Sequence, residues 1–321
     1  MLLVRNARAI AGVFIMLLLT ACSTVQMQML RSSPPAHLPA RAELTQVAFY
    51  PQEEHQCGPA SLAMALQNAG VNVEPQQMTS FVYLPEKQGS LQVEMLAAAR
   101  RHGMVAYLLS PKLADVLTEI AAGNPVVVLQ NLGLSWYPVW HYAVAVGYDL
   151  RSEQMILRSG HEARQELPFF TFESTWARSN YWAMVVLPPG RLPQTATPET
   201  YLPGIAALEH SSPDSDVWPA YAAAMQRWPD SLAAKIAAGN YAYGRNNLAL
   251  AEQLFQEAVQ AHPDSVAAYN NLAQTLSDLG KYETALAAAR HAVEMGGPLE
   301  PVARSTLAEI EQKKMEHDRK N

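Results

Sequence analysis

The sequence predicts two folded domains: an α+β domain whose sheet is antiparallel, followed by an all-α domain built from repeated helices. The chain of 321 residues is long enough for about two domains of ordinary size. Between residues 46 and 189, helical patterns come first and strand-like patterns follow, an order typical of α+β proteins. Between residues 217 and 315, small and aromatic residues recur with a period of 34, which indicates a repeated pair of helices.

The expected helices of the first domain each end at a glycine, which readily adopts the backbone conformation that stops a helix. They cover residues 58–70, 90–102 and 112–122. Short apolar runs rich in valine, alanine and tyrosine predict the strands. These runs are residues 104–109, 125–129, 141–148, 154–158 and 181–187.

Composition and charge exclude several classes of protein. Apolar residues make up 49% of the chain, which excludes a disordered or fibrous protein. The formal charge is −6 and the sequence has no run of lysines and arginines, so nucleic acid is not an expected partner. Two cysteines are too few for a disulfide scaffold, and no predicted helix carries two histidines at metal-ligand spacing. We therefore expect neither a metal ion nor another cofactor.

Residues 1–21 have the layout of a secretory signal, with two arginines, an apolar run and then small residues. The apolar run of about eleven residues is shorter than the roughly 20 that span a bilayer. Its end, Leu19-Thr20-Ala21-Cys22, resembles a bacterial lipobox, and this resemblance implies that Cys22 carries lipid once the signal is removed. An ordinary signal peptide or a membrane anchor is the alternative.

Residues 22–45 contain several serines and prolines, which predicts a flexible tether. Ser23 follows the lipobox cysteine where an aspartate would favour the inner membrane, so the same resemblance implies the outer membrane. We therefore expect a lipid-anchored protein of the bacterial cell envelope that faces the periplasm.

Cys57 is the candidate nucleophile. It precedes a predicted helix that starts Gly58-Pro59-Ala60, and a polar loop leads into it. The free N–H groups and the positive dipole end of a helix favour the reactive thiolate and can hold the oxyanion formed by attack on a carbonyl. Gln52 is placed to add a side-chain N–H to that oxyanion site. A small buried core cysteine is the alternative interpretation.

His141 is the candidate base, because it opens the strand His-Tyr-Ala-Val-Ala-Val-Gly-Tyr. Alternation along the strand places Ala143, Ala145 and Gly147 on the same face as His141. Such a row of small residues predicts that the helix bearing Cys57 packs closely on this face. A histidine with a purely structural role at the strand end is the alternative.

The C-terminal pattern resembles tetratricopeptide repeats, in which each unit has two helices. Gly239 and Asn246 of one unit correspond to Ala273 and Gly280 of the next, 34 residues later. A degenerate repeat is expected before them, and residues 299–314 are expected to form a polar capping helix. An ordinary bundle of helical hairpins is the alternative.

Residues 190–216 are rich in proline, threonine and serine, so we predict a linker between the domains, with a short helix near 205–210.

The cysteine motif and the histidine strand together resemble the papain-like cysteine peptidases of the bacteriocin-exporter family, which remove double-glycine leaders. The whole layout is similar to stand-alone bacterial lipoproteins that join such a domain to tetratricopeptide repeats. The resemblance covers residues 46–189 for the peptidase and 217–315 for the repeats. It implies that Cys57 is the nucleophile, that His141 is the base and that Gln52 supports the oxyanion site.

The third catalytic residue departs from the family. The family has an aspartate on the next strand that orients the histidine, and here Ser159 takes that place. A serine can accept a hydrogen bond from imidazole but cannot stabilise imidazolium as a carboxylate does. Asp149 is the alternative third residue, although its position favours the start of a hairpin turn. The family's transporter segments are also missing, so a leader peptide delivered by a fused exporter is not the expected substrate.

The sequence therefore predicts an envelope lipoprotein that hydrolyses peptide bonds through a thioester on Cys57. Peptide or protein substrates are the expected ligands of this site. The repeats are expected to recruit the substrate or a protein partner through their concave face. Two alternatives remain on the same fold, a module that binds peptides without cutting them and an acyltransferase that uses the same Cys–His pair.

Overall fold

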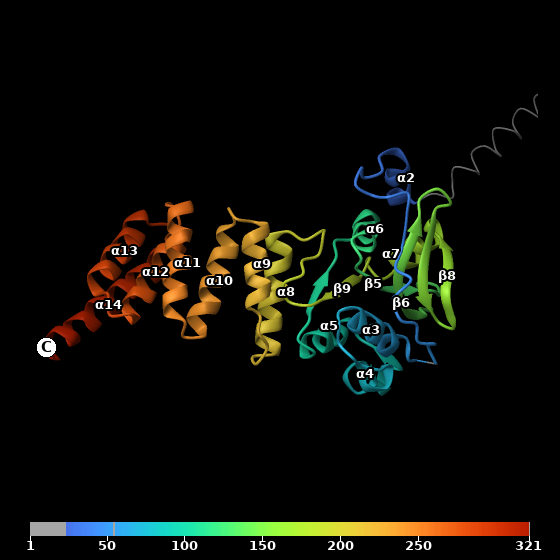
Figure 1. Ribbon diagram of the computed structural model, residues 1–321, viewed down its shortest axis with the longest axis horizontal. Coiled ribbons are helices and arrows are strands. Elements are labelled where there is room, and N and C mark those ends of the chain that lie inside the picture. The colour runs from blue at the N-terminus through green and yellow to red at the C-terminus, as the bar shows by residue number, and fades with distance from the viewer. Residues whose placement is uncertain (1–23, 54, 321) are drawn as a thin grey trace, which may run out of the picture. The chain divides into compact units, whose positions relative to one another are not determined.

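The computed structural model describes residues 24–53 and 55–320, which form two compact units (Figure 1). The first unit runs to Pro188 and includes Pro193–Ala196 and His210–Pro213. The second comprises Pro189–Leu192, Thr197–Glu209 and the chain from Asp214 onward. The first unit is α+β with an antiparallel sheet and the second is helical, which confirms the predicted fold class.

A seven-stranded antiparallel sheet forms the centre of the first unit, in the order β4-β9-β5-β6-β7-β8, with β1 paired to β6. The strands are β1 (Arg41–Glu43), β4 (Val105–Leu108), β5 (Val126–Asn131), β6 (Trp140–Asp149), β7 (Gln154–Ser159), β8 (Glu162–Pro168) and β9 (Ala183–Leu187). Strands β5 and β9 are buried along their whole length, because they lie inside the sheet with helices on both faces.

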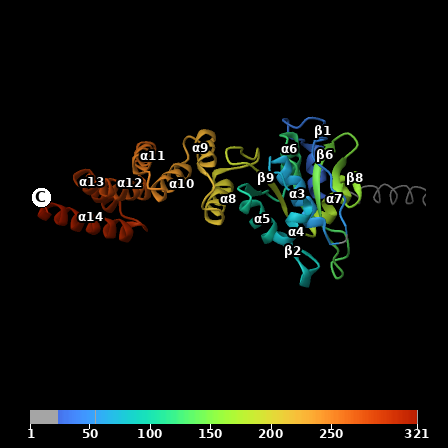
Figure 2. The same ribbon diagram turned by 60° about the horizontal axis from the view of Figure 1, so that its bottom comes forward.

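The helices of the first unit are α2 (Val25–Ser32), α3 (Cys57–Asn68), α4 (Pro75–Val82), α5 (Gln92–Arg101), α6 (Leu113–Ala121) and α7 (Phe169–Ala177). A short 3-10 helix (Pro85–Lys87) separates the two strands of a small hairpin, β2 (Tyr83–Leu84) and β3 (Gly89–Ser90). Figure 2 shows α3 and α4 side by side near this hairpin, in agreement with their contacts. Helices α4 and α7 and strand β8 were not predicted from the sequence; in α4 and β8 the apolar residues are too few to give a clear period.

The two faces of the sheet carry different helices. The Tyr142 hydroxyl donates to the carbonyl of Ser90 (3.3 Å), and Ser90 lies against the first turn of α3. The preceding residue, His141, pairs with Gln130, whose amide donates to Thr175 of α7 (2.7 Å). Since paired residues share a face and consecutive residues alternate, α3 lies on the Tyr142 face and α7 on the His141 face. Helix α2 packs on both α6 and α7, so these three helices form one layer.

This arrangement corrects one expectation. The face that His141 shares with Ala143 and Ala145 was expected to receive the helix of Cys57, but it lies on the side of α7. Helix α3 instead packs on the opposite face of β6, where its own small residues permit close approach. Gly58 also permits close approach to the small hairpin, because a Cβ there would lie 2.2 Å from the Oγ of Ser90 in β3.

The predicted tether, residues 22–45, is also wrong over its described part. Met27 and Leu30 of α2 are buried against the domain, and β1 adds to the central sheet. The buried carboxylate of Glu173 accepts hydrogen bonds from the backbone N–H groups of Gln26 (3.3 Å) and Met27 (3.1 Å). A carboxylate at a helix N-terminus meets both the free N–H groups and the helix dipole, so it holds α2 in place. The serines and prolines that suggested a tether lie mostly after this helix.

The second unit contains seven helices among its described residues. They are α8 (Pro198–Ser211), α9 (Trp218–Arg227), α10 (Leu232–Gly244), α11 (Leu248–Ala261), α12 (Val266–Asp278), α13 (Tyr282–Met295) and α14 (Glu300–Lys320). Helix α8 contains the short helix predicted near 205–210, but it is longer than expected and replaces much of the predicted linker at residues 190–216. Its buried residues Tyr201, Ile205 and Leu208 follow the spacing of an apolar helix stripe, which the prolines around them obscured.

Equivalent positions 34 residues apart have the same local structure in the repeats. Ser231 and Ser265 each cap a helix by accepting a hydrogen bond from the N–H three residues later. Asn246 and Gly280 both have a positive φ, of 58° and 75°, at the turn between two helices. A Cβ at Gly239 would lie 2.5 Å from the Phe255 ring, so the two helices of this unit cross where only glycine fits.

Candidate active site

Cys57 is the first residue of α3 and follows the N-cap residue Gln56. Pro59 has no N–H group, and the N–H of Ala60 already binds the Gln56 carbonyl (3.1 Å). The N–H groups of Cys57 and Gly58 are therefore left at the helix end, and both interact with the thiol. The sequence motif thus builds the helix end that the nucleophile prediction assumed.

The thiol is half-buried, and its environment has two opposing effects. Burial raises the pKa of Cys57, and this is the larger effect. The backbone N–H groups of Tyr142, Gly58 and Cys57 itself lower that pKa. Because burial prevails, the resting group is the neutral thiol at neutral pH, and not the thiolate expected from the helix end alone.

His141 lies near the start of β6, and its Nε2 is 2.9 Å from the Ser159 Oγ of β7. The two strands place the predicted base and the predicted third residue in direct contact. Since Nε2 is engaged with Ser159, Nδ1 is the ring nitrogen that remains for a proton from a thiol. Burial lowers the pKa of His141, so the imidazole is also neutral at neutral pH.

The backbone of Tyr142 joins the two catalytic candidates. Its N–H interacts with the Cys57 thiol, and Tyr142 is the residue directly after His141. Although α3 packs on the face of β6 opposite to His141, its thiol therefore meets the strand through a backbone N–H, which lies in the plane of the sheet, at the residue next to the candidate base. Tyr142 was not singled out in the sequence, because a backbone contact leaves no signal in the identity of the side chain.

Gln52 is buried and ties three segments together. Its Nε2 donates weakly to Ser61 of α3 (3.3 Å) and to the Tyr142 carbonyl (3.4 Å). Its Oε1 accepts the N–H of Gly160 (2.9 Å), and its own N–H donates to the Gly160 carbonyl (2.9 Å). Gln52 thus fixes its loop beside the end of β7 and the start of α3. Its amide lies among the site residues, and both of its long donor bonds can be exchanged for a bond to an oxyanion.

Asp149 lies away from this cluster. It is the last residue of β6, eight residues after His141, which corresponds to about 26 Å of extended strand. Its carboxylate accepts the N–H groups of Arg151 (2.8 Å) and Ser152 (3.2 Å), and these bonds lower its pKa. Asp149 therefore caps the hairpin turn away from the His141 ring, whereas Ser159 contacts that ring.

The structure thus brings the Cys57 thiol to the backbone N–H of the residue after His141 and holds the His141 ring against Ser159. Burial favours the neutral form of both groups, so a reaction that used them would require transfer of the thiol proton to the imidazole. Ser61 and Gly160 support the site through Gln52, and neither was predicted. The glycine after the predicted strand could have indicated a tight turn at this position, and Gly160 indeed has a φ of 58° in the turn that follows β7.

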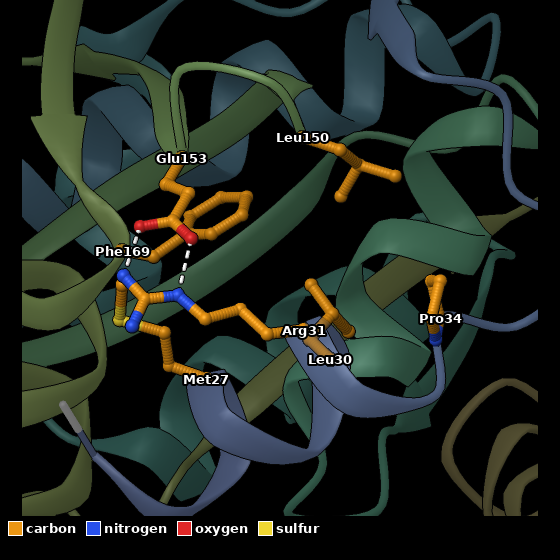
Figure 3. A pocket seen from close by; sticks show the side chains of 7 residues that line it. All are labelled: Met27, Leu30, Arg31, Pro34, Leu150, Glu153 and Phe169. Atoms are coloured by element: carbon orange, nitrogen blue, oxygen red, sulfur yellow. Dashed lines mark hydrogen bonds and ion pairs between the residues drawn. The ribbon is translucent and has the colours of Figure 1, made fainter.

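A separate pocket of about 280 Å³ lies at the opposite end of β6 (Figure 3). Its walls include Leu30, Leu150 and Phe169, and the guanidinium of Arg31 forms two bonds to the Glu153 carboxylate (2.5 and 2.6 Å). The pocket is the seam where α2 joins the domain, and it contains none of the predicted site residues.

Cys22 and residues 1–21 lie outside the described residues. Across residues 24–53 and 55–320, none of the helices is long and apolar enough to span a membrane. Within the same ranges, no group of three or more His, Cys, Asp or Glu side chains is placed to hold a metal ion.

Comparison with known proteins finds a similar family for each domain. Residues 44–184 match the Peptidase_C39-like family, and residues 219–266 and 254–287 match tetratricopeptide repeats. Two similar solved structures are a C39-like peptidase of Bacillus anthracis and the peptidase domain of Streptococcus ComA, a bifunctional ABC transporter of a quorum-sensing pathway. The first is 20% identical with a TM-score of 0.39, covering 46% of this chain and 98% of its own. The second is 19% identical with a TM-score of 0.36, covering 44% and 98%. No curated protein sequence matches the chain.

Proposed function

We propose that the C39-like peptidase domain of this chain hydrolyses peptide bonds with Cys57 as nucleophile and His141 as base. One observation carries the proposal. The Cys57 thiol interacts with the backbone N–H of the residue after His141, while the His141 ring is held by Ser159 on the adjacent strand. A cysteine with only a packing role would not need a helix end, an oriented imidazole and a buried amide at one point of the sheet.

The proposed reaction begins when the Cys57 thiol gives its proton to His141 Nδ1 and its sulfur attacks the carbonyl carbon of the substrate. The N–H of Cys57 and the amide of Gln52 stabilise the resulting oxyanion. The leaving amine takes the proton from His141 as the C–N bond breaks, which leaves a thioester on Cys57. Water then attacks the thioester and gives its proton to His141, which returns it to the sulfur as the acid product departs.

The first test is substrate-independent. Iodoacetamide should alkylate Cys57 in the wild-type chain, and His141→Ala should slow this alkylation by at least tenfold because the base is lost. The second test compares the envelope proteins of cells carrying the wild type and Cys57→Ser, which should differ in the proteins that are cleaved. Equal alkylation in His141→Ala together with identical protein patterns would contradict the proposal.

A second candidate function is peptide binding without cleavage. The raised pKa of Cys57 and the neutral Ser159 in place of a carboxylate both favour it. In that case purified chain should retain peptides but leave them intact on long incubation. Acyl transfer by the same pair is distinguished by its product, because the acyl group would then be joined to an added amine instead of to water.

We further propose that the repeats recruit a protein or peptide partner. A hollow of about 110 Å³ is lined by Asn240 and Tyr243 of α10 and by Asn271, Gln274 and Thr275 of α12, with Phe255 at its base. The Asn271 amide donates to the Asn240 carbonyl oxygen (3.0 Å), so the two helices present paired amides that can bind a peptide backbone. Asn271→Ala should reduce the recovery of cross-linked partner without changing the alkylation of Cys57.

For location, we propose a lipid-anchored protein of the cell envelope. This rests on the sequence around Cys22, and lipid labelling tests it. Cys22→Ala should abolish incorporation of a labelled fatty acid, and labelling that persists in this variant would contradict the anchor.

A further inference from the structure

An exposed two-stranded ribbon extends the sheet beyond the candidate active site. Strands β5 and β6 pair as far as Asn131 with Trp140, and the pairing continues through Leu134 with Tyr137. The Leu132 N–H donates to the Val139 carbonyl (2.8 Å), so the pairing at the tip keeps the register of the strands, although residues 132, 133, 138 and 139 belong to neither strand.

The ribbon is preformed by polar contacts at its base. The Asn131 Oδ1 accepts the N–H groups of Gly133 (3.0 Å) and Val139 (2.9 Å), which bridges the two strands. Arg178, just after α7, donates to the carbonyls of Asn131 (3.2 Å) and Gly133 (2.6 Å). A Cβ at Gly133 would lie 2.3 Å from the Tyr137 carbonyl oxygen, so the strands approach closely there. A two-stranded ribbon alone is marginally stable, and these bonds hold it in one conformation.

The ribbon presents apolar side chains to solvent, four of them on one face, while Trp140 (52% exposed) lies on the other. Leu132, Leu134, Tyr137 and Val139 are 51%, 51%, 72% and 47% exposed. They occupy two adjacent cross-strand pairs of the register, so all four side chains point the same way. Residues 124–148 contain no aspartate, glutamate, lysine or arginine, so the ribbon has no charged side chain of its own, and the Arg178 guanidinium contacts backbone carbonyls at its base. Single exposed apolar residues are ordinary, whereas a fixed cluster of four marks a contact surface.

The same face carries the candidate base. His141 pairs with Gln130, which is two residues before Leu132, and His141 is two residues after Val139. The alternation of side chains therefore places His141 on the face of the four apolar residues. Strand geometry puts Val139 about 7 Å and Tyr137 about 13 Å along the ribbon from His141.

We propose that this apolar face binds the substrate polypeptide on one side of the bond that Cys57 attacks. The inference rests on the proposed function, and it names the substrate class as peptides with uncharged apolar side chains near the scissile bond. An extended substrate also advances about 3.3 Å per residue, so the two apolar pairs match side chains two and four positions from that bond. The occupant is the substrate because the face is continuous with that of His141, and a separate partner would have no reason to share it.

The test uses the full chain and a peptide library made by tryptic digestion of a bacterial lysate. Mass spectrometry of the products gives the residues around each cleaved bond. We expect the wild type to favour leucine, isoleucine, valine or aromatic residues at the second and fourth positions on one side. The double variant Leu134→Ser/Tyr137→Ser should reduce this preference by about tenfold, a typical effect of losing an apolar subsite contact.

Two controls separate recognition from folding. Val93→Ser removes an exposed apolar side chain of α5 elsewhere in the domain and should keep the preference. Tyr137→Phe keeps the aromatic ring and should also keep the preference for apolar residues. The rate of Cys57 alkylation should be equal in all of these variants, which shows that the site itself is intact.

The outcomes distinguish this inference from the proposed function. Cleavage without an apolar preference, or a preference unchanged in Leu134→Ser/Tyr137→Ser, would overturn the inference and leave the peptidase intact. Absence of any cleavage would overturn the peptidase. In that case, retention of library peptides on immobilised Cys57→Ser chain decides the inference. Retained peptides rich in apolar pairs, lost when the ribbon substitutions are added, would support it, and no retention would refute it.

Discussion

Replacing Ser159 with alanine tests how much this site depends on its unusual third residue. Within the described residues, the Ser159 hydroxyl is the hydrogen-bond partner of the His141 ring, at 2.9 Å. A hydrogen bond between neutral groups contributes about 0.5–1.5 kcal/mol net. If that whole amount is lost in the transition state, the rate falls roughly two- to thirteenfold. Neutralising the carboxylate of a serine triad costs about 10⁴ instead, because that carboxylate also stabilises the imidazolium.

The assay is the second-order rate of Cys57 alkylation by iodoacetamide as a function of pH, followed by cleavage of the peptide library. Ser159→Ala should lower both rates by no more than about tenfold. Ser159→Asp should place a carboxylate beside the ring, raise the pKa of His141 and move the acid limb of the profile to higher pH. Asp149→Asn is the matched control, and it should change neither rate because Asp149 caps a turn at the far end of β6.

Two results would refute this reasoning. A loss of more than about a hundredfold in Ser159→Ala would mean that Ser159 does more than hold the ring, since one neutral hydrogen bond cannot supply that energy. A comparable loss in Asp149→Asn would mean that the carboxylate acts on the site despite its distance.

Three further predictions concern stability and domain structure. Burial lowers the pKa of His141, so on acidification His141 gains its proton in the unfolded chain before it does in the folded chain. Burial raises the pKa of Cys57, so on alkalinisation Cys57 loses its proton in the unfolded chain first. The free energy of unfolding should therefore fall below about pH 6.5 and above about pH 8.5, and urea titrations should show that Cys57→Ser removes the alkaline part. Glu173→Gln should cost about 1–2 kcal/mol, and limited proteolysis should cut sooner within α2, because the charge at that helix end is lost; unchanged cleavage would contradict the docking role. Gly239→Ala should destabilise the repeats by about 1–3 kcal/mol in thermal melts because its Cβ meets Phe255, while Cys57 alkylation stays constant; a simultaneous loss of alkylation would contradict two separate units.

Local patterns in the sequence predicted most of the elements near the site. The helix start at Cys57 and the strand at His141 were visible because their signals, a Gly-Pro pair and strict alternation, lie within a few residues. The contact between His141 and Ser159 was expected from family resemblance, and the structure places the two groups together. The small-residue face of β6 was assigned to the wrong helix, because alternation tells which residues share a face but not which element covers it.

Features that depend on distant partners could not be predicted. Helix α2 has only two buried apolar residues, and its position depends on Glu173, which lies 146 residues further along the chain than Met27. Gln52 likewise bonds to backbone atoms of Gly160 and Tyr142, which lie 108 and 90 residues further along the chain, and no local pattern encodes such contacts. The effect of burial on the pKa of Cys57 could not be predicted for the same reason, since that burial comes from the assembled fold.

The docking of α2 sets how far the domain could move from a membrane. Only Ser23 separates Cys22 from Thr24, whose hydroxyl is bound to the Glu173 carboxylate. Two residues span at most about 7 Å, whereas a free tether of 24 residues would have an r.m.s. end-to-end distance of roughly 27 Å. A lipid on Cys22 would therefore hold the domain, and with it the candidate active site, at a nearly fixed height above the bilayer. Membrane-bound substrates would then be selected partly by the distance of their cleavable bond from the membrane surface. This constraint would not apply to soluble peptides.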